Sequence, residues 1–144
     1  MNVAAILRQK GRAVTTAPPS ITLLEVAQRL AHKRIGAIVV VDAQGELVGI
    51  VSERDIILAL SEVGPDCLTR PVSERMTRQV VTCDVGEPMA WILQLMDAHQ
   101  IRHVPITRDG LLCGIVSILD VIKYRLAEID AEARALKAYV AGYA

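Results

Sequence analysis

The sequence contains very few aromatic residues. Among its 144 residues there is no phenylalanine, and aromatic side chains make up 3% of the total, whereas hydrophobic residues make up 52%. This composition is typical of a globular protein and not of a disordered one. We therefore expect an aliphatic core built from Val, Ile, Leu and Ala.

The sequence also lacks an excess of charge of either sign. Sixteen Lys and Arg residues balance sixteen Asp and Glu residues, and no basic cluster forms a stripe along the chain. Proteins that bind nucleic acid or an anionic membrane surface usually carry such a stripe. We therefore expect no nucleic acid and no membrane as a partner.

Long apolar runs and a cysteine framework are missing as well. The apolar run at 37–41 is far shorter than the roughly 20 residues that cross a bilayer. Residues 1–8 lack the apolar core of a signal peptide, so we expect a cytoplasmic protein. Cys67, Cys83 and Cys113 are odd in number and have no metal-ligand spacing, which predicts reduced thiols and no metal site.

The sequence does contain an internal repeat. The segment Gly-Ile-Val-Ser-Glu-Arg-Asp at 49–55 returns as Gly-Ile-Val-Ser-Ile-Leu-Asp at 114–120, an offset of 65 residues. The apolar positions of the helical segments upstream correspond at an offset of 66 residues. This duplication predicts two copies of one supersecondary unit. Because each copy alone would be marginally stable, we expect the copies to share a core in one folded body.

Turn residues and hydrophobic periodicity predict the same order of elements, β-α-β-β-α, in both copies, and so the fold class α/β (α+β). Thr22 and Glu25 form a capping box at the first helix, and Pro88 takes a favoured first-turn position in its counterpart. The expected elements are strands at 14–16, 38–41 and 47–51 with helices from 23 to about 34 and after 52, then strands at 80–82, 101–107 and 112–116 with helices from 88 and after 117.

These elements divide the chain into five parts. The extension before the first copy contains a short helix at 3–10, which Gly11 ends, and the segment between the copies contains one helical turn at 72–76. The predicted parts are an N-terminal helical extension at 1–13, the first copy at 14–63, a linker at 64–79, the second copy at 80–126 and a C-terminal helical extension at 127–144.

The last predicted helix carries an apolar stripe whose positions are spaced alternately by four and three residues. This spacing is typical of a heptad seam, which packs against another surface. The stripe consists of Ile122, Leu126, Ile129, Ala133, Leu136 and Val140.

On these residues the chain resembles the cystathionine-β-synthase (CBS) domain pair, or Bateman module, in a standalone bacterial form. The resemblance covers residues 14–125 and rests on the two Gly-Ile-Val-Ser-x-x-Asp segments and on the strands at 35–41 and 101–106. It implies two repeats packed about a pseudo-twofold axis, with two clefts that often bind adenosine nucleotides or adenosyl compounds. Many such pairs also dimerise, so the resemblance predicts a homodimer.

In this family the Asp of the Ser/Thr-x-x-Asp motif holds ribose hydroxyls, a role that falls here on Asp55 and Asp120. An ionised carboxylate suits this role because it accepts short, strong hydrogen bonds. Ser52 and Ser117 lie where free backbone N–H groups at a helix start favour a phosphate. The same motif is also an ordinary helix cap, and the sequence leaves this second interpretation open.

Three basic side chains are candidate phosphate ligands. Arg54, Arg102 and His103 offer planar guanidinium groups and an imidazole whose charge responds to pH. The alternatives are that Arg54 is a solvated helix residue and that His103 is a partly buried structural histidine. Because Leu119 replaces Arg54 in the second copy, the two clefts are expected to differ in affinity.

The candidates for the adenine pocket come only from the resemblance. Thr16 and Thr82 match positions that line this pocket in the family. Pro105, on the same expected strand as Arg102 and His103, is a further candidate for ligand binding. In the first copy, Gly36 and Ala37 stand in place of Arg102 and His103. Phosphate binding there would therefore depend on Arg54 or on residues of the other repeat.

The sequence offers little for catalysis. It has no nucleophile with a matching base and no glycine-rich phosphate loop, and Cys83 is interpreted as a small apolar filler. We therefore expect a non-catalytic sensor that requires no cofactor and binds AMP, ADP or ATP, with NAD-type dinucleotides and S-adenosylmethionine left open. The alternatives are a ligand-free homodimeric scaffold and a regulatory subunit of a separately encoded enzyme or transporter, which would require a protein partner.

Overall fold

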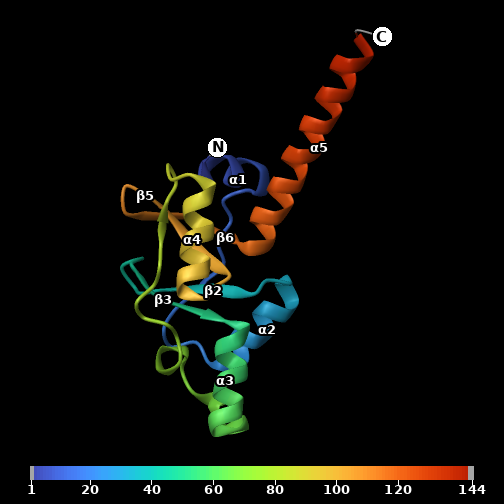
Figure 1. Cartoon of the computed structure of the whole chain (residues 1–144). Coiled ribbons are helices and arrows are strands. Elements are labelled where there is room, and N and C mark those ends of the chain that lie inside the picture. Colours follow the sequence, from blue (N-terminus) through green and yellow to red (C-terminus); the bar gives the residue numbers. More distant parts are fainter. Residues whose placement is uncertain (1, 143–144) are drawn as a thin grey trace.

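The fold is a pair of three-stranded sheets with helices around them (Figure 1). The computed structural model describes residues 2–142, so residue 1 and residues 143–144 of the predicted extensions lie outside it. Each sheet belongs to one of the two copies predicted from the sequence. The mixed α+β fold class is confirmed.

The first repeat has the predicted β-α-β-β-α order. Thr22 caps the first helix, since its side chain accepts a hydrogen bond from the backbone N–H of Glu25. The first strand pairs in parallel with the second, which pairs antiparallel with the third. The elements are β1 (Thr16–Ala17), α2 (Leu23–Lys33), β2 (Ala37–Val41), β3 (Leu47–Ser52) and α3 (Glu53–Val63).

The second repeat has the same order and the same strand pairing. Its hairpin turns at Asp109 and Gly110, which both have a positive φ angle. The elements are β4 (Cys83–Asp84), α4 (Met89–His99), β5 (His103–Arg108), β6 (Leu111–Ser117) and α5 (Ile118–Gly142).

Two short strands differ from the expectation. The prediction of a strand at 80–82 was wrong, because the chain first pairs with β5 at Cys83, opposite Ile106. Val80 and Val81 have high β propensity, but they line a cavity instead of joining the ladder. The strand expected at 14–16 is likewise displaced, to Thr16–Ala17. Pro88 is the N-cap of α4 and not its first helical residue.

The segment before each repeat packs on the other repeat. Helix α1 (Val3–Lys10) precedes the first repeat, but its buried side chains join the core of the second. The short 3-10 helices η1 (Pro65–Thr69) and η2 (Val72–Glu74) precede the second repeat and pack into the core of the first. The structure therefore has two core clusters, one for each repeat, where the sequence suggested one shared core.

Two glycines make room for these crossing segments. A Cβ atom on Gly49 would lie 2.5 Å from Met76 Sδ, and one on Gly114 would lie 2.8 Å from Leu7 Cδ2. Met76 and Leu7 are both buried. A glycine at the same point of each repeat thus lets an apolar side chain from the preceding segment pack against the sheet.

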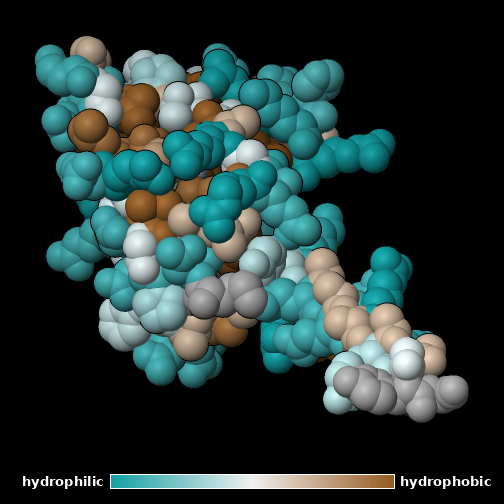
Figure 2. Space-filling model, turned by 90° about the horizontal axis from the view of Figure 1, so that it is seen from above, coloured by the Kyte–Doolittle hydropathy of each residue, from teal (hydrophilic) through white to brown (hydrophobic). Residues whose placement is uncertain are grey.

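Helix α5 begins against the second repeat and then leaves the body of the molecule (Figure 1). Val121 near its start is 2% exposed, whereas every residue from 129 to 142 is exposed. In Figure 2 the far end of this helix stands clear of the rest of the surface. Among residues 2–142, no helix combines the length and the apolar character needed to span a membrane.

Candidate functional site

A cavity of about 700 Å³ lies between the two repeats. This volume is within the range of small-molecule sites, roughly 300–1,000 Å³. One wall comes from β3 and the start of α3, and the other from the segment before β4 and from β5. The cavity brings together six of the ten site residues expected from the sequence: Ser52, Arg54, Asp55, Arg102, His103 and Pro105.

Asp55 lies in the first turn of α3 and caps that helix. Its Oδ2 accepts hydrogen bonds from the backbone N–H of Ser52, at 2.8 Å, and from the Ser52 hydroxyl, at 3.2 Å. The interpretation as a helix cap is therefore confirmed. Both bonds end on the same oxygen, and among the described residues Oδ1 receives none.

The basic groups around the cavity come from both repeats. Arg54 lies in α3 of the first repeat, whereas Arg102 directly precedes β5 of the second repeat and His103 is its first residue. The sequence showed that the first repeat has no basic residue on its own corresponding strand. The basic residues of the second repeat line the same cavity as Asp55, so the cavity combines two carboxylates, Asp55 and Glu53, with two guanidinium groups and an imidazole.

His103 lies at the contact between the repeats. A Cβ atom on Gly36 would approach His103 Nε2 to 2.7 Å and Glu53 Oε1 to 2.8 Å, so the ring packs directly over this glycine. Burial lowers the pKa of His103 below its usual range, since burial disfavours the imidazolium form. Glu53 and Asp120 act in the opposite direction, whereas Lys10 and Arg102 act in the same direction as burial.

The lowered pKa of His103 has a measurable effect on stability. Below about pH 6.5 the unfolded chain takes up a proton at this residue before the folded chain does, so the free energy of unfolding falls as the pH is lowered toward the folded pKa. We expect NMR titration of the imidazole to give a pKa below 6.5, with a His103→Gln variant to assign the resonance. A pKa above 6.5 would contradict the burial of the ring.

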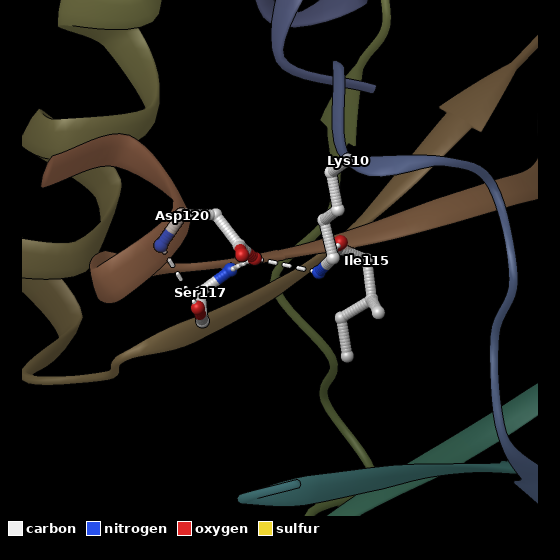
Figure 3. A network of polar contacts seen from close by, with 4 residues as sticks. All are labelled: Lys10, Ile115, Ser117 and Asp120. Atoms are coloured by element: carbon white, nitrogen blue, oxygen red, sulfur yellow. Dashed lines mark hydrogen bonds and ion pairs between the residues drawn. The ribbon is translucent and has the colours of Figure 1, made fainter. Parts of the chain in front are cut away.

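Asp120, the counterpart of Asp55, is already paired with a cation (Figure 3). Its Oδ2 accepts a hydrogen bond from the backbone N–H of Ser117 at 2.8 Å and also contacts Lys10 Nζ at 2.5 Å. Lys10 Nζ donates in addition to the carbonyl oxygen of Ile115 at 2.6 Å. The lysine comes from the last turn of α1, so a residue outside both repeats occupies the motif of the second.

The ion pair is reflected in the titration of Asp120. Burial opposes the charged carboxylate, but hydrogen bonds from Lys10 and Ser117 and the charge of Lys10 outweigh it and lower the pKa below its usual range. Asp120 is therefore ionised at neutral pH. Its stabilising effect is present above the pKa of the unfolded chain and is lost as the pH falls through the folded pKa.

The other expected site residues do not line the cavity. Thr16 and Thr82 are both exposed, and the carbonyl oxygen of Thr16 accepts a hydrogen bond from Arg29 at 3.5 Å. Ser117 and Asp120 cap the start of α5. These four residues remain candidates only for a second cleft or for a bound state of the protein.

Several lining residues were not anticipated from the sequence. The segment with Gln79, Val80 and Val81 was interpreted as linker and strand. No part in the site was predicted for Gly36 or Glu53. Lys10 was also missed, because a lysine in the last turn of a helix is explained by the helix dipole alone. The internal repeat was the one available signal, since it places the segment before each copy at an equivalent position.

Cys83 offers no sign of reactivity. Its side chain is 2% exposed, and burial, with smaller contributions from Glu87 and Asp84, raises the pKa of the thiol to about 11. A thiol that stays protonated is a poor nucleophile. The thiol belongs to the core of the second repeat, where it packs as a small apolar group.

Comparison with known families gives one consistent result. A family model described as CBS domain matches the chain twice, over residues 7–62 and 72–127. The CBS domain-containing protein YhcV of Bacillus subtilis is 39% identical over 107 residues, which cover 74% of this chain and 75% of YhcV. The chain spans 63% of the length of an uncharacterized 17.7 kDa protein of Acidianus ambivalens, which is 36% identical over 106 residues, or 73% of this chain.

Solved structures show the same fold. The CBS-domain containing protein ATU1752 from Agrobacterium tumefaciens has a TM-score of 0.85 at 39% identity, covering 87% of this chain and 99% of that one. The CBS domain protein PAE2072 from Pyrobaculum aerophilum, complexed with AMP, has a TM-score of 0.75 at 29% identity, with coverages of 83% and 89%. The CBS domain pair of MJ0100, in complex with 5′-methylthioadenosine and S-adenosyl-L-methionine, has a TM-score of 0.78 at 29% identity, with coverages of 89% and 98%.

Proposed function

This chain belongs to the CBS domain family, and from that premise we propose that it is a non-catalytic regulatory module that binds an adenosine nucleotide between its repeats. The observation that carries the proposal is the cavity that Asp55 lines together with Arg54, Arg102 and His103. A carboxylate and a set of cations in one cavity of about 700 Å³ match the two polar halves of a nucleotide.

Each part of a nucleotide has a matching group in the cavity. The ribose hydroxyls would donate to Asp55, and the phosphate would lie near Arg54 and Arg102 at the start of α3. The base would pack on the apolar residues of the wall, namely Ile50, Val80, Val81 and Pro105. The ligands present in the PAE2072 and MJ0100 structures share an adenosine group, which supports this class of ligand.

Charge favours a nucleotide with phosphate over S-adenosylmethionine. Two arginines line the cavity, and the guanidinium group is a cation with several N–H donors. They attract a phosphate, a group that S-adenosylmethionine lacks, whereas the lining carboxylates Glu53 and Asp55 balance their effect on the positive sulfonium. We therefore propose AMP, ADP or ATP as the ligand, with AMP as the first compound to test.

The proposal is tested by calorimetric titration of the full chain with AMP, ATP, NADH, S-adenosylmethionine and inorganic phosphate. We expect AMP or ATP to bind, and S-adenosylmethionine to bind more weakly. At a ligand concentration about a hundred times the dissociation constant, the folded state gains about 2.7 kcal/mol, which raises the unfolding temperature visibly. Absence of heat and of a thermal shift with every adenosine compound would contradict the proposal.

A regulatory module needs a response that follows binding. A ligand shifts a conformational equilibrium only if it binds one conformation better than another. The cavity is lined by residues of both repeats, so a ligand that contacts both walls would favour one relative placement of the repeats. The partner could be a separately encoded enzyme or transporter, as the sequence analysis allows, whose activity would depend on this relative placement of the repeats.

We further propose that two copies of the chain associate through α5. The apolar stripe predicted from the sequence is exposed: Leu126, Ile129 and Leu136 are 60%, 47% and 64% exposed. A different side of this helix faces the body near its start, where Val121 is 2% exposed and the Glu128 side chain 11% exposed. The heptad seam therefore points away from the body.

The charges beside the seam match a second copy of the same helix. In a parallel pair of α5 helices, Arg125 of one copy would lie opposite Asp130 of the other, and Glu132 opposite Lys137. Both pairs have opposite signs. A second copy of α5 would therefore bury the apolar seam and pair the charges beside it.

Placing a charge in the seam should separate the copies. We expect the wild-type protein to have twice the mass of the 15.6 kDa chain in light scattering after size exclusion, and Ile129→Lys to have the mass of one chain. The matched control is Ala131→Lys, an exposed position on the opposite side of the same helix. A dimeric Ile129→Lys variant, or a monomeric wild type, would contradict association through α5.

A further inference from the structure

The two repeats differ in the partners of their Ser-x-x-Asp motifs. Asp120 Oδ2 is in contact with Lys10 Nζ, as Figure 3 shows, whereas Asp55 receives hydrogen bonds only from Ser52 among the described residues. The carboxylate of this motif therefore lines an open cavity in the first repeat, as Asp55, and contacts a lysine in the second, as Asp120.

The neighbouring backbone shows the same difference. Ile50 and Ile115 are equivalent positions, one residue after Gly49 and Gly114. Ile50 exchanges two backbone hydrogen bonds with Thr77, at 3.0 and 2.9 Å. Ile115 instead offers its carbonyl oxygen to Lys10 Nζ at 2.6 Å. The lysine ammonium thus bridges two acceptors of the second repeat, one of them the candidate ribose ligand.

We propose that Lys10 is a built-in competitor that closes the second cleft to ligands. The inference rests on the proposed function, because it concerns the counterpart of the Asp55 site. An ammonium and a pair of ribose hydroxyls are both donors that need the same carboxylate. A nucleoside can bind to Asp120 only when Lys10 has left it.

The position of Lys10 suits a tethered group that can be displaced. Helix α1 is held firmly, because Val3, Ile6 and Leu7 are 0–1% exposed in the second core. Lys10 is the last residue of this helix, and Gly11, with φ of 98°, follows it. Its side chain is 29% exposed, so it can swing into solvent while α1 stays docked.

Partial burial makes the competition effective. The Asp120 side chain is only 17% exposed, so water screens this ion pair less than it screens a pair on the open surface. Leu119 also stands where the first repeat has Arg54, which leaves the second cleft without that phosphate ligand. The second cleft should therefore take a nucleoside without phosphate once the lysine is removed.

The test counts adenosine sites in the full chain by calorimetry. Lys10→Met keeps the apolar stem of the side chain and removes its charge. Lys33→Met is a matched control, since within residues 2–142 the Lys33 ammonium donates a hydrogen bond to Thr15 Oγ1 at 3.3 Å and forms no ion pair. We expect one site per chain in the wild type and in Lys33→Met, and two sites in Lys10→Met. The added site should disappear in the double variant Lys10→Met, Asp120→Ala.

The outcomes separate this inference from the proposed function. A single site in Lys10→Met, or two sites already in the wild type, would overturn the role of Lys10 and leave the first cavity unaffected. A wild type without any site, together with one Asp120-dependent site in Lys10→Met, would refute binding at Asp55 but support the competition. No binding in any variant would contradict both. Thermal unfolding of each variant shows that it is folded.

Discussion

Replacing Asp55 by alanine is expected to weaken AMP binding by roughly 10- to 150-fold. A hydrogen bond to a charged group contributes about 1.5–3 kcal/mol, and Asp55 is the carboxylate that we assign to the ribose in a cavity also lined by two arginines and a histidine. The substitution removes the acceptor for the ribose while Arg54, Arg102 and His103 stay in place. Calorimetric titration of the wild type and the variant with AMP measures the difference.

A control must separate the loss of the ligand contact from the loss of a helix cap. Asp55 also caps α3 through its hydrogen bonds with Ser52, so its removal is expected to lower the free energy of unfolding by about 0.5–2 kcal/mol. Thr22→Ala removes a cap from α2, outside the cavity. We expect Thr22→Ala to lose similar stability and to bind AMP normally. Equal affinity in Asp55→Ala and wild type would refute the assignment of Asp55 as ribose ligand.

Replacing Leu7 by alanine is expected to lower the free energy of unfolding by about 2–5 kcal/mol. Leu7 is 1% exposed and packs over Gly114 in the core of the second repeat, so truncation leaves a cavity there. Helix α1 would then be held less firmly against β6 and α5. Urea denaturation followed by circular dichroism measures the loss.

The matched control is Arg8→Ala, the exposed neighbour on the same helix, which is expected to change stability by less than about 0.5 kcal/mol. If Leu7→Ala also changed stability by so little, α1 would not be part of the second core. The contact between Lys10 and Asp120 would then be unexplained, since Lys10 reaches Asp120 only while α1 packs on the second repeat.

The repeat predicted most of the fold because it constrains two copies at once. The Gly-Ile-Val-Ser segments predicted where β3 gives way to α3 and where β6 gives way to α5. The capping residues predicted where α2 and α3 begin. The short strands were harder, since β1 and β4 contain two residues each and depend on where a neighbouring strand lies. Val80 and Val81 show this limit, because their local propensity indicates a strand and the tertiary structure places them in a cavity wall.

The candidate site could be predicted only in part, for a similar reason. Asp55, Arg54, Arg102 and His103 were identified by motif and charge, but their convergence on one cavity follows from how the repeats pack. Lys10 lies 110 positions away from Asp120 in the sequence. No local pattern connects these two residues, so their contact required the crossing of α1 onto the second repeat.

The most direct test of the proposed function is a crystal structure of the protein grown with AMP. We expect one AMP in the cavity between the repeats, with its ribose hydroxyls within hydrogen-bond distance of Asp55 and its phosphate toward Arg54, Arg102 and His103. A cavity without nucleotide at saturating AMP, or a nucleotide bound away from Asp55, would contradict the proposal.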